Sequence, residues 1–229
     1  MYWQEAEDKQ AFVVPSDIQD LSFRTQGKCL PLDHAHSLSS AIRAVLPWLT
    51  DEPGSGIHLI HVAESGNGWF RPEDPSRELL HLSRRTRLTL RVPEHRVEDA
   101  KTLSGKTLHI DGHDLTVGEA SNKLLSPLTT VFSRYVVDQS EGDETAFVEQ
   151  VVRQLGELDI HVRKLLCGRP HAFQLPDKPL PVRSVLLADL KQTESVLLQQ
   201  HGLGPHRLLG CGLFLPHKGV APVAADKDD

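Results

Sequence analysis

The chain has 229 residues, which is enough for one large domain or for two domains of about 100 residues each. Its hydrophobic content of 39% is sufficient for a buried core and excludes a wholly disordered chain. No apolar run approaches the ~18 residues of a membrane span, and the N-terminus, MYWQEAEDKQ, is acidic where a signal peptide would be basic. We therefore expect a cytoplasmic protein without a membrane partner.

The net charge of −6 is distributed unevenly along the chain. Acidic residues concentrate in three segments, residues 1–20, 138–159 and 226–229. Residues 160–225 instead hold eight lysines and arginines against three acidic residues. A local basic surface on an acidic protein is compatible with RNA binding, although it does not establish it.

The predicted elements of the first half follow the order β-α-β-β-α-β. Residues 18–26 have the character of a short strand, and Pro31 and Asp33 then open a helix with Asp33 as its N-cap. The apolar positions of this helix recur at helical spacing: Leu38, Ala41, Ile42, Val45, Leu46 and Leu49. The remaining elements are strands over 56–63 and 79–92, a short helix from Pro93 to about Leu103, and a strand or hairpin over 106–118.

The second half repeats this pattern. A strand over 128–137 precedes a helix whose apolar face consists of Phe147, Val148, Val151, Val152, Leu155 and Leu158. Strands near 160–167 and 181–190, a helix capped by Thr193 and ended by Gly202, and a strand over 211–216 follow. The sequence thus predicts an α+β fold of two tandem ferredoxin-like (RRM-like) βαββαβ domains, residues 18–122 and 123–220, with a disordered tail over 221–229.

The segment GLGPHRLLGCGLF, residues 202–214, lies between the last predicted helix and the last predicted strand. Its four glycines bracket His206 and Arg207. Glycine lets the backbone approach a ligand closely and expose N–H groups, from which phosphate oxygens accept hydrogen bonds. A phosphate-binding loop is one interpretation, and a helix C-cap followed by a plain glycine-rich turn is the other.

Together, this loop and the tandem fold resemble the CRISPR-associated Cas-Six family, endoribonucleases that cut CRISPR repeat transcripts into guide RNAs. The loop fits the family's pattern GxGxxRxxGxG near the C-terminus. The segment LPLDHAHSLSSAIRAVLPWL, residues 30–49, is similar to a family branch with a Pro-x-Asp-His motif at the first helix. The segments GIHLIHV, ESGNGW, LSRRTRLTLRVP and GCGLFLPHKG fit that branch in order, so the resemblance covers about residues 18–219.

The resemblance implies that the protein binds a CRISPR repeat hairpin, cuts it without metal or cofactor, and keeps the guide RNA. It also implies a catalytic histidine at the first helix, His34 by motif position, with His36 as the second candidate. Histidine can take the proton of a ribose 2′-hydroxyl or protonate the leaving 5′-oxygen near neutral pH. The products would carry 2′,3′-cyclic phosphate and 5′-hydroxyl ends. Other subunits of a type I CRISPR effector complex are further expected partners.

Three groups of residues are candidates for RNA binding. The Gly-rich loop and the segment after it contribute Gly204, His206, Arg207, Gly210, Gly212 and Lys218. A predicted strand face carries His81, Arg85, Arg87 and Arg91, in alternation with apolar residues, and a second basic cluster consists of Arg163, Lys164 and Arg169. A solvated surface is the alternative for both basic groups. Because only 5% of the residues are aromatic, we expect recognition by shape and phosphate contacts rather than by base stacking.

Metal chemistry fits the sequence less well. The three cysteines, Cys29, Cys167 and Cys211, stand too far apart to indicate a thiolate zinc site or a disulfide framework. The pair His34-x-His36 lacks the downstream Asp-His of a metallohydrolase, and His58 and His61 would face opposite sides of a strand. We therefore expect no metal site.

Two further alternatives concern the type of protein. Two-histidine phosphoesterases need two His-x-Ser/Thr motifs, and here only His81-Leu82-Ser83 fits. The main rival is a non-catalytic scaffold subunit of a CRISPR effector complex, which binds guide RNA without cutting it. A histidine at the first helix together with a late Gly-rich loop favours the enzyme, and cleavage of repeat RNA by the protein alone would discriminate between the two.

Overall fold

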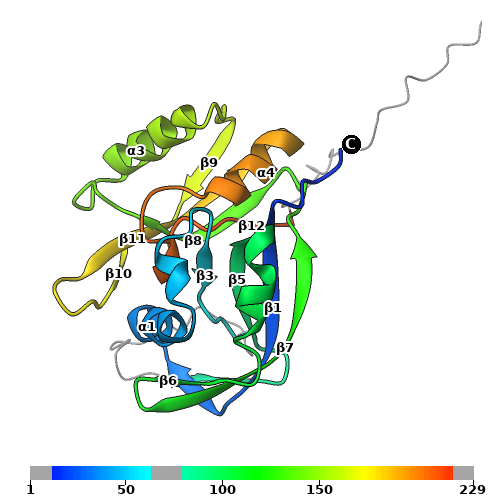
Figure 1. Cartoon of the computed structure of the whole chain (residues 1–229). Helices are drawn as coiled ribbons and strands as arrows, with labels where there is room; N and C mark the ends of the chain where they lie inside the picture. Colours follow the sequence, from blue (N-terminus) through cyan, green and yellow to red (C-terminus); the bar gives the residue numbers. More distant parts are fainter. Residues whose placement is uncertain (1–11, 63–78, 219–229) are drawn as a thin grey trace, which may run out of the picture.

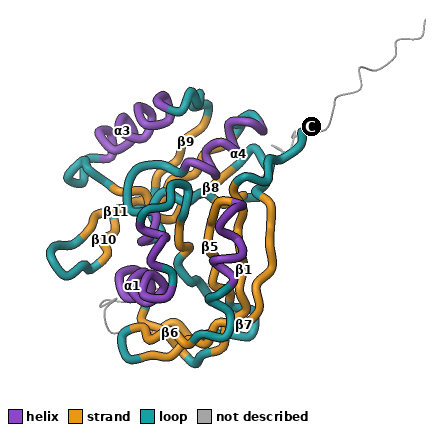
Figure 2. The backbone as a smooth tube through the Cα atoms, viewed as in Figure 1, coloured by secondary structure: helices purple, strands orange, loops and turns teal. Residues whose placement is uncertain are grey.

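Two antiparallel sheets, each packed against helices, organise the chain (Figure 1). The computed structural model describes residues 12–62 and 79–218. Figure 2 shows α3 (Glu144–Glu157) and α4 (Gln192–His201) together at one end of the molecule and the hairpin of β6 (Thr107–Ile110) and β7 (His113–Leu124) toward the other. No helix in this described part is long and apolar enough to cross a membrane.

The first sheet has the strand order β3-β5-β1-β7-β6, and all its neighbouring strands are antiparallel. Besides the hairpin it contains β1 (Ile18–Gln26), β3 (Gly56–His58) and β5 (Arg87–Pro93). Alternation in β1 buries Leu21 and Phe23 in a core with α1 (Ala35–Val45) and α2 (Val97–Lys101). The short helix η1 (Pro47–Thr50) follows α1, and the short helix η2 (Glu94–Arg96) precedes α2. Without β6, this order is that of a ferredoxin-like unit, as predicted.

The second sheet repeats that order. Its path is β10-β11-β8-β12, and β9 also pairs with β11. The strands are β8 (Val131–Val137), β9 (Lys164–Cys167), β10 (His171–Phe173), β11 (Leu180–Ala188) and β12 (Leu215–Pro216). The apolar faces of α3 and α4 pack with β8 and β11 in a second core. Two tandem ferredoxin-like units, with β6 and β10 added to them, are therefore the fold of this α+β chain.

A third apolar cluster connects the two halves. Ala35, at the start of α1, packs with Val137, Val182 and Phe173 from the second sheet and with Cys211 from the Gly-rich loop. Burial of these side chains fixes the N-terminus of α1 against the second half of the molecule. The loop returns from α4 to the side of α1, where its short helix η3 (Arg207–Leu209) contacts β3 and α1 (Figure 1).

The single strand predicted over 79–92 is wrong. The structure has a separate strand β4 (Leu79–His81), which pairs with β2 (Cys29–Pro31), followed by a turn and then β5. The turn is closed by the backbone N–H of Thr86, which donates to the carbonyl of Ser83, and by the Thr86 hydroxyl, which accepts from the N–H of Ser83. Side chains that turn the backbone in this way interrupt the alternation on which the prediction relied.

The helix ends also differ from the predictions in part. His34, not Asp33, is the N-cap of α1, and the carboxylate of Asp33 instead accepts a hydrogen bond from the N–H of Gln174. Lys191 takes the N-cap position predicted for Thr193, whereas Gly202 ends α4 with φ 70°, as expected. Strand β10 was not predicted. The expected disordered tail, 221–229, and the motif ESGNGW, 64–69, lie outside the described residues.

Candidate functional site

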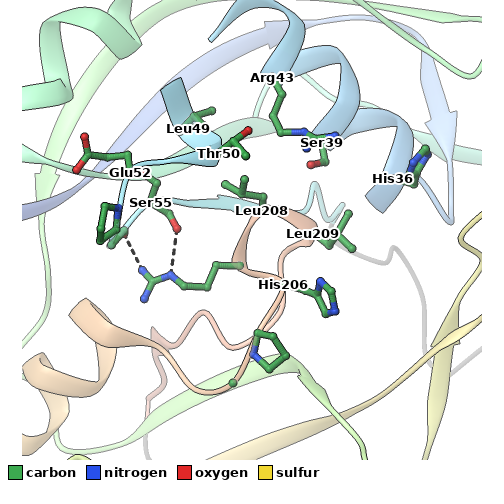
Figure 3. A pocket seen from close by; sticks show the side chains of 15 residues that line it. His36, Ser39, Arg43, Leu49, Thr50, Glu52, Ser55, His206, Leu208 and Leu209 are labelled. Atoms are coloured by element: carbon green, nitrogen blue, oxygen red, sulfur yellow. Dashed lines mark hydrogen bonds between the residues drawn. The ribbon is translucent and has the colours of Figure 1, made fainter. Parts of the chain in front are cut away.

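A hollow of about 480 Å³ lies between α1, the turn after η1 and the Gly-rich loop (Figure 3). The first wall comes from α1, with His36, Ser39 and Arg43. The second comes from the segment Leu49–Ser55, and the third consists of Gly204, Pro205, His206, Arg207, Leu208 and Leu209. The hollow therefore joins both sequence motifs that indicated a function, although they are far apart in the chain.

The periodicity of α1 decides which side chains face this hollow. Ala35, Leu38 and Ile42 are buried on one side of the helix. His36 and Arg43 lie seven positions apart, two turns along the other side, and both are exposed. His36 was predicted as a site residue and Arg43 was not, although the spacing of Arg43 from His36 was an available signal.

His34 occupies a different environment from His36. Its side chain is 2% exposed, and Nδ1 lies 2.8 Å from the carbonyl oxygen of Pro31 and 3.1 Å from that of Leu32. Its Nε2 accepts a hydrogen bond from the N–H of Ile60 at 3.1 Å, so the proton of the neutral ring is on Nδ1. Burial lowers the pKa of His34 despite these contacts. Both nitrogens of a neutral imidazole are thus engaged within the protein.

Two glycines of the loop, Gly210 and Gly212, are needed for the packing of the loop itself. A Cβ on Gly212, which has φ 65°, would lie 2.1 Å from the carbonyl oxygen of Leu203, and a Cβ on Gly210 would lie 2.7 Å from the Leu59 side chain. Both glycines are buried, so their positions explain the spacing without any RNA contact. Gly204, in contrast, is exposed at the hollow, with φ 74°.

Arg207 fastens the loop to its surroundings. Its guanidinium donates to the carbonyl oxygens of Ser55 at 3.0 Å, Gly54 at 2.7 Å and Gln200 at 2.9 Å, and also to that of His201. Burial lowers the pKa of Arg207 to about 10. Because the guanidinium is committed to backbone carbonyls, Arg207 positions the loop rather than offering a free cation to phosphate.

His206 is held at the hollow by its backbone and leaves its ring exposed. It has a left-handed conformation, φ 66°, and its carbonyl accepts from the N–H groups of Leu209 and Cys211 at 2.8 and 3.2 Å. Among the described residues, the ring of His206 has no hydrogen-bond partner, and neither does the ring of His36. Two unengaged imidazoles therefore line one hollow.

The predicted basic strand face does not exist as a single surface. Arg91 is completely buried: it donates to both carboxylate oxygens of Asp20 at 2.8 and 2.9 Å and to the carbonyls of Gln199 and Phe214 at 2.7 and 3.0 Å. Burial would raise the pKa of Asp20, but the charge of Arg91 and contacts with His58 hold it well below its usual range. The second half of the molecule covers this end of β5, so assigning Arg91 to RNA is wrong for the folded protein.

The other predicted cations remain at the surface. His81, Arg85 and Arg87 are exposed, and the guanidinium of Arg87 donates to carbonyls of its own turn. In the second basic cluster, Arg163 pairs with Glu194 at 2.7 Å and Lys164 with Asp189 at 2.8 Å, while Arg169 is exposed. Lys218 is exposed just after β12. None of these seven residues lines the hollow.

The two other histidines considered as metal ligands face different partners. His58 lies 3.5 Å from the carboxylate of Asp20, and the ring of His61 lies 5.9 Å from that of Tyr135. Across the described ranges, no group of three or more His, Cys, Asp or Glu side chains is arranged to hold a metal ion. Among the described residues that line the hollow, one carries a carboxylate, Glu52, and it is paired with Arg96 at 2.7 Å.

Known proteins are similar to this chain in sequence or in fold. A family model described as Cas6 Crispr matches residues 19–219. A CRISPR-associated endonuclease Cas6 from Myxococcus xanthus (strain DK1622) is 34% identical over 204 residues, which cover 89% of this chain and 84% of that relative. A solved structure of a CRISPR associated protein Cas6 superposes with a TM-score of 0.60 at 12% identity, covering 88% of this chain and 100% of that chain. Another, of an RAMP protein binding different RNA substrates, has a TM-score of 0.58 at 13% identity and covers 87% and 100%.

Proposed function

This chain belongs to the Cas6 family, and we propose that it is an endoribonuclease that cuts CRISPR repeat transcripts in the hollow between α1 and the Gly-rich loop. The observation that carries the proposal is the position of His36. Its ring is exposed at the N-terminus of an 11-residue helix, at the end of the hollow where the loop residues His206 and Leu209 also lie (Figure 3). A relative named as a CRISPR-associated endonuclease supports the choice of a CRISPR transcript as substrate.

The walls of the hollow suit the phosphate at the cut site. The first N–H groups of α1 carry the positive end of the helix dipole, which attracts anions to the side of His36. In the described part of the chain, the backbone N–H groups of Gly204 and His206 donate to no protein acceptor. Arg43 adds an exposed positive charge. These donors can stabilise the additional charge on the phosphorus oxygens as the reaction proceeds.

Cleavage of the RNA by its own 2′-hydroxyl needs a base rather than a metal ion. His36 takes the proton of the ribose 2′-hydroxyl, the 2′-oxygen attacks the adjacent phosphorus, and the bond to the 5′-oxygen breaks. The products carry 2′,3′-cyclic phosphate and 5′-hydroxyl ends. Divalent cations such as Mg²⁺ bind mainly through oxygen ligands. Within the part of the chain that the structure describes, Glu52 is the one carboxylate lining the hollow, and it is paired with Arg96. The donor set therefore favours cleavage without metal.

We assign the base to His36 rather than to His34, which the motif position favoured. The Nε2 lone pair of His34 is occupied by the N–H of Ile60, and its Nδ1 proton is held by two carbonyls. A base needs a free lone pair within reach of the hydroxyl. His34 instead stabilises the connection between the start of α1 and the segment after β3.

Cleavage of a repeat RNA by the purified protein tests the proposal. We expect cutting in EDTA, a 5′-hydroxyl product, and no cutting of an RNA with a 2′-deoxy sugar at the cut site. Binding without cutting would support the scaffold alternative, and activity lost in EDTA and restored by a divalent ion would contradict the mechanism. Retention of the product hairpin, and association with other subunits of a type I CRISPR complex, are also proposed. Retention predicts guide RNA in the purified protein, and association predicts that other subunits co-purify with it.

A further inference from the structure

The cleavage needs a second proton transfer, because the 5′-oxygen is a poor leaving group unless it is protonated. We propose that His206 is the general acid that gives the leaving 5′-oxygen its proton. This inference rests on the proposed function, since it assigns one step of the same cleavage. The position of His206 relative to His36 carries it.

The two histidines belong to different walls of one hollow. His36 projects from α1 and His206 from the Gly-rich loop, and Figure 3 shows both rings at the same end of the hollow, beside Leu209. In an in-line displacement at phosphorus, the attacking and leaving oxygens lie on opposite sides of the reacting phosphate. A base and an acid must therefore reach the phosphate from two directions, and these walls provide them.

The loop fixes His206 while leaving its ring unengaged. The left-handed backbone, φ 66°, is uncommon for a residue other than glycine, and two N–H groups from the following turn hold its carbonyl. The next residue, Arg207, is hydrogen-bonded to the turn after η1. Backbone strain of this kind is found preferentially at functional sites, where the surrounding structure maintains it. The left-handed backbone thus orients a ring that has no hydrogen-bond partner within residues 12–62 and 79–218.

The proton and electron balance of the step is complete with these two groups. Neutral His36 accepts the proton of the 2′-hydroxyl while the bond from the 2′-oxygen to phosphorus forms. The bond from phosphorus to the 5′-oxygen breaks, its electron pair stays on that oxygen, and the oxygen takes a proton from the imidazolium of His206. The reaction ends with His36 protonated and His206 neutral, and exchange with water restores both.

The other charged groups of the hollow are poorer proton donors. Arg43 and Arg207 carry guanidinium groups, which hold their protons too tightly for acid catalysis at neutral pH. Glu52 is hydrogen-bonded to Arg96, which lowers the pKa of its carboxyl and keeps it ionised. A carboxylate in this state has no proton to give. His206 is therefore the acid that the walls of the hollow offer.

A repeat RNA with sulfur in place of the bridging 5′-oxygen at the cut site tests the assignment, because a thiolate leaves without being protonated. His206→Asn is the main variant, since asparagine tolerates the left-handed conformation. His36→Ala removes the base, and His109→Ala is a control at an exposed histidine of β6 that pairs with Asp114. Single-turnover rates with saturating protein separate the chemical step from RNA binding.

We expect His206→Asn to cut the normal RNA about 100-fold or more slowly and the sulfur-containing RNA at the wild-type rate. His36→Ala should be slow on both substrates, and His109→Ala normal on both. If His206→Asn is slowed equally on the two substrates, the inference is overturned in favour of a contact with RNA. It is also overturned if His206→Asn cuts the normal RNA at the wild-type rate. If the wild-type protein cuts neither RNA, the proposed function itself fails.

Discussion

Replacing Arg91 by methionine would test how the two halves of the molecule are held together. Methionine keeps an apolar chain but removes the guanidinium, which pairs with Asp20 and donates to the carbonyls of Gln199 and Phe214. Asp20 is 7% exposed, and breaking a buried pair in this way costs about 3–5 kcal/mol. Since about 1 kcal/mol shifts the melting temperature by ~2–4 °C in a chain of this size, we expect a fall of roughly 6–20 °C.

Thermal unfolding followed by circular dichroism measures this change, with Arg87→Met as the matched control. Arg87 lies on the same strand but is exposed, so its replacement should alter the stability by no more than about 0.5 kcal/mol. Adding Asp20→Asn to Arg91→Met should restore part of the loss, because it removes the unpaired charge. If Arg91→Met melts like Arg87→Met and instead binds RNA more weakly, the buried role of Arg91 is refuted.

Three further predictions concern pH, the loop and the phosphate. Burial lowers the pKa of His34 and of His58 below the ordinary value of 6.5, so the unfolded chain binds more protons than the folded chain below that pH. The melting temperature should therefore stay constant above pH ~6.5 and decline as the pH falls toward the lowered pKa values. A decline that His34→Gln leaves unchanged would contradict this. Gly212→Ala should lower the free energy of unfolding in a urea titration, because its Cβ would meet the Leu203 carbonyl. Gly204→Ala, whose Cβ would meet no backbone atom, should lower it less, and equal losses would refute the packing argument. Arg43→Gln should weaken binding of repeat RNA and reduce the slope of log affinity against log salt by roughly one unit, and parallel slopes would place Arg43 away from phosphate.

The sequence allowed the order of elements to be predicted because it depends on local patterns. The strand predicted over 18–26 has the same bounds as β1, and the helix predicted after Asp33 begins within two residues of the start of α1. A glycine with positive φ ended α4 where expected. Burial across the interface between the two halves is not encoded locally. Arg91 continues an alternating pattern, but α4 and Phe214 cover the face on which it lies.

The candidate site was predicted only in part, because local motifs indicate its segments but not the contacts between them. The motifs indicated both the start of α1 and the Gly-rich loop, and the structure brings them together around one hollow. Our preference for His36 over His34 rests on the hydrogen bond from the N–H of Ile60 to His34, and Ile60 is 26 residues away from His34 in the chain. Arg207 matched the family pattern, yet its contacts with Gly54 and Ser55 give it a positioning role.

Single-turnover cleavage of repeat RNA by His36→Ala and by His34→Gln tests the central claim most directly, namely that the hollow beside α1 is the cutting site and His36 its base. We predict a loss of about 100- to 10,000-fold in rate for His36→Ala, with RNA affinity nearly unchanged. His34→Gln should melt at a lower temperature, but at temperatures at which it is folded it should cut at close to the wild-type rate. Normal cutting by His36→Ala, with loss of cutting in folded His34→Gln, would contradict the account.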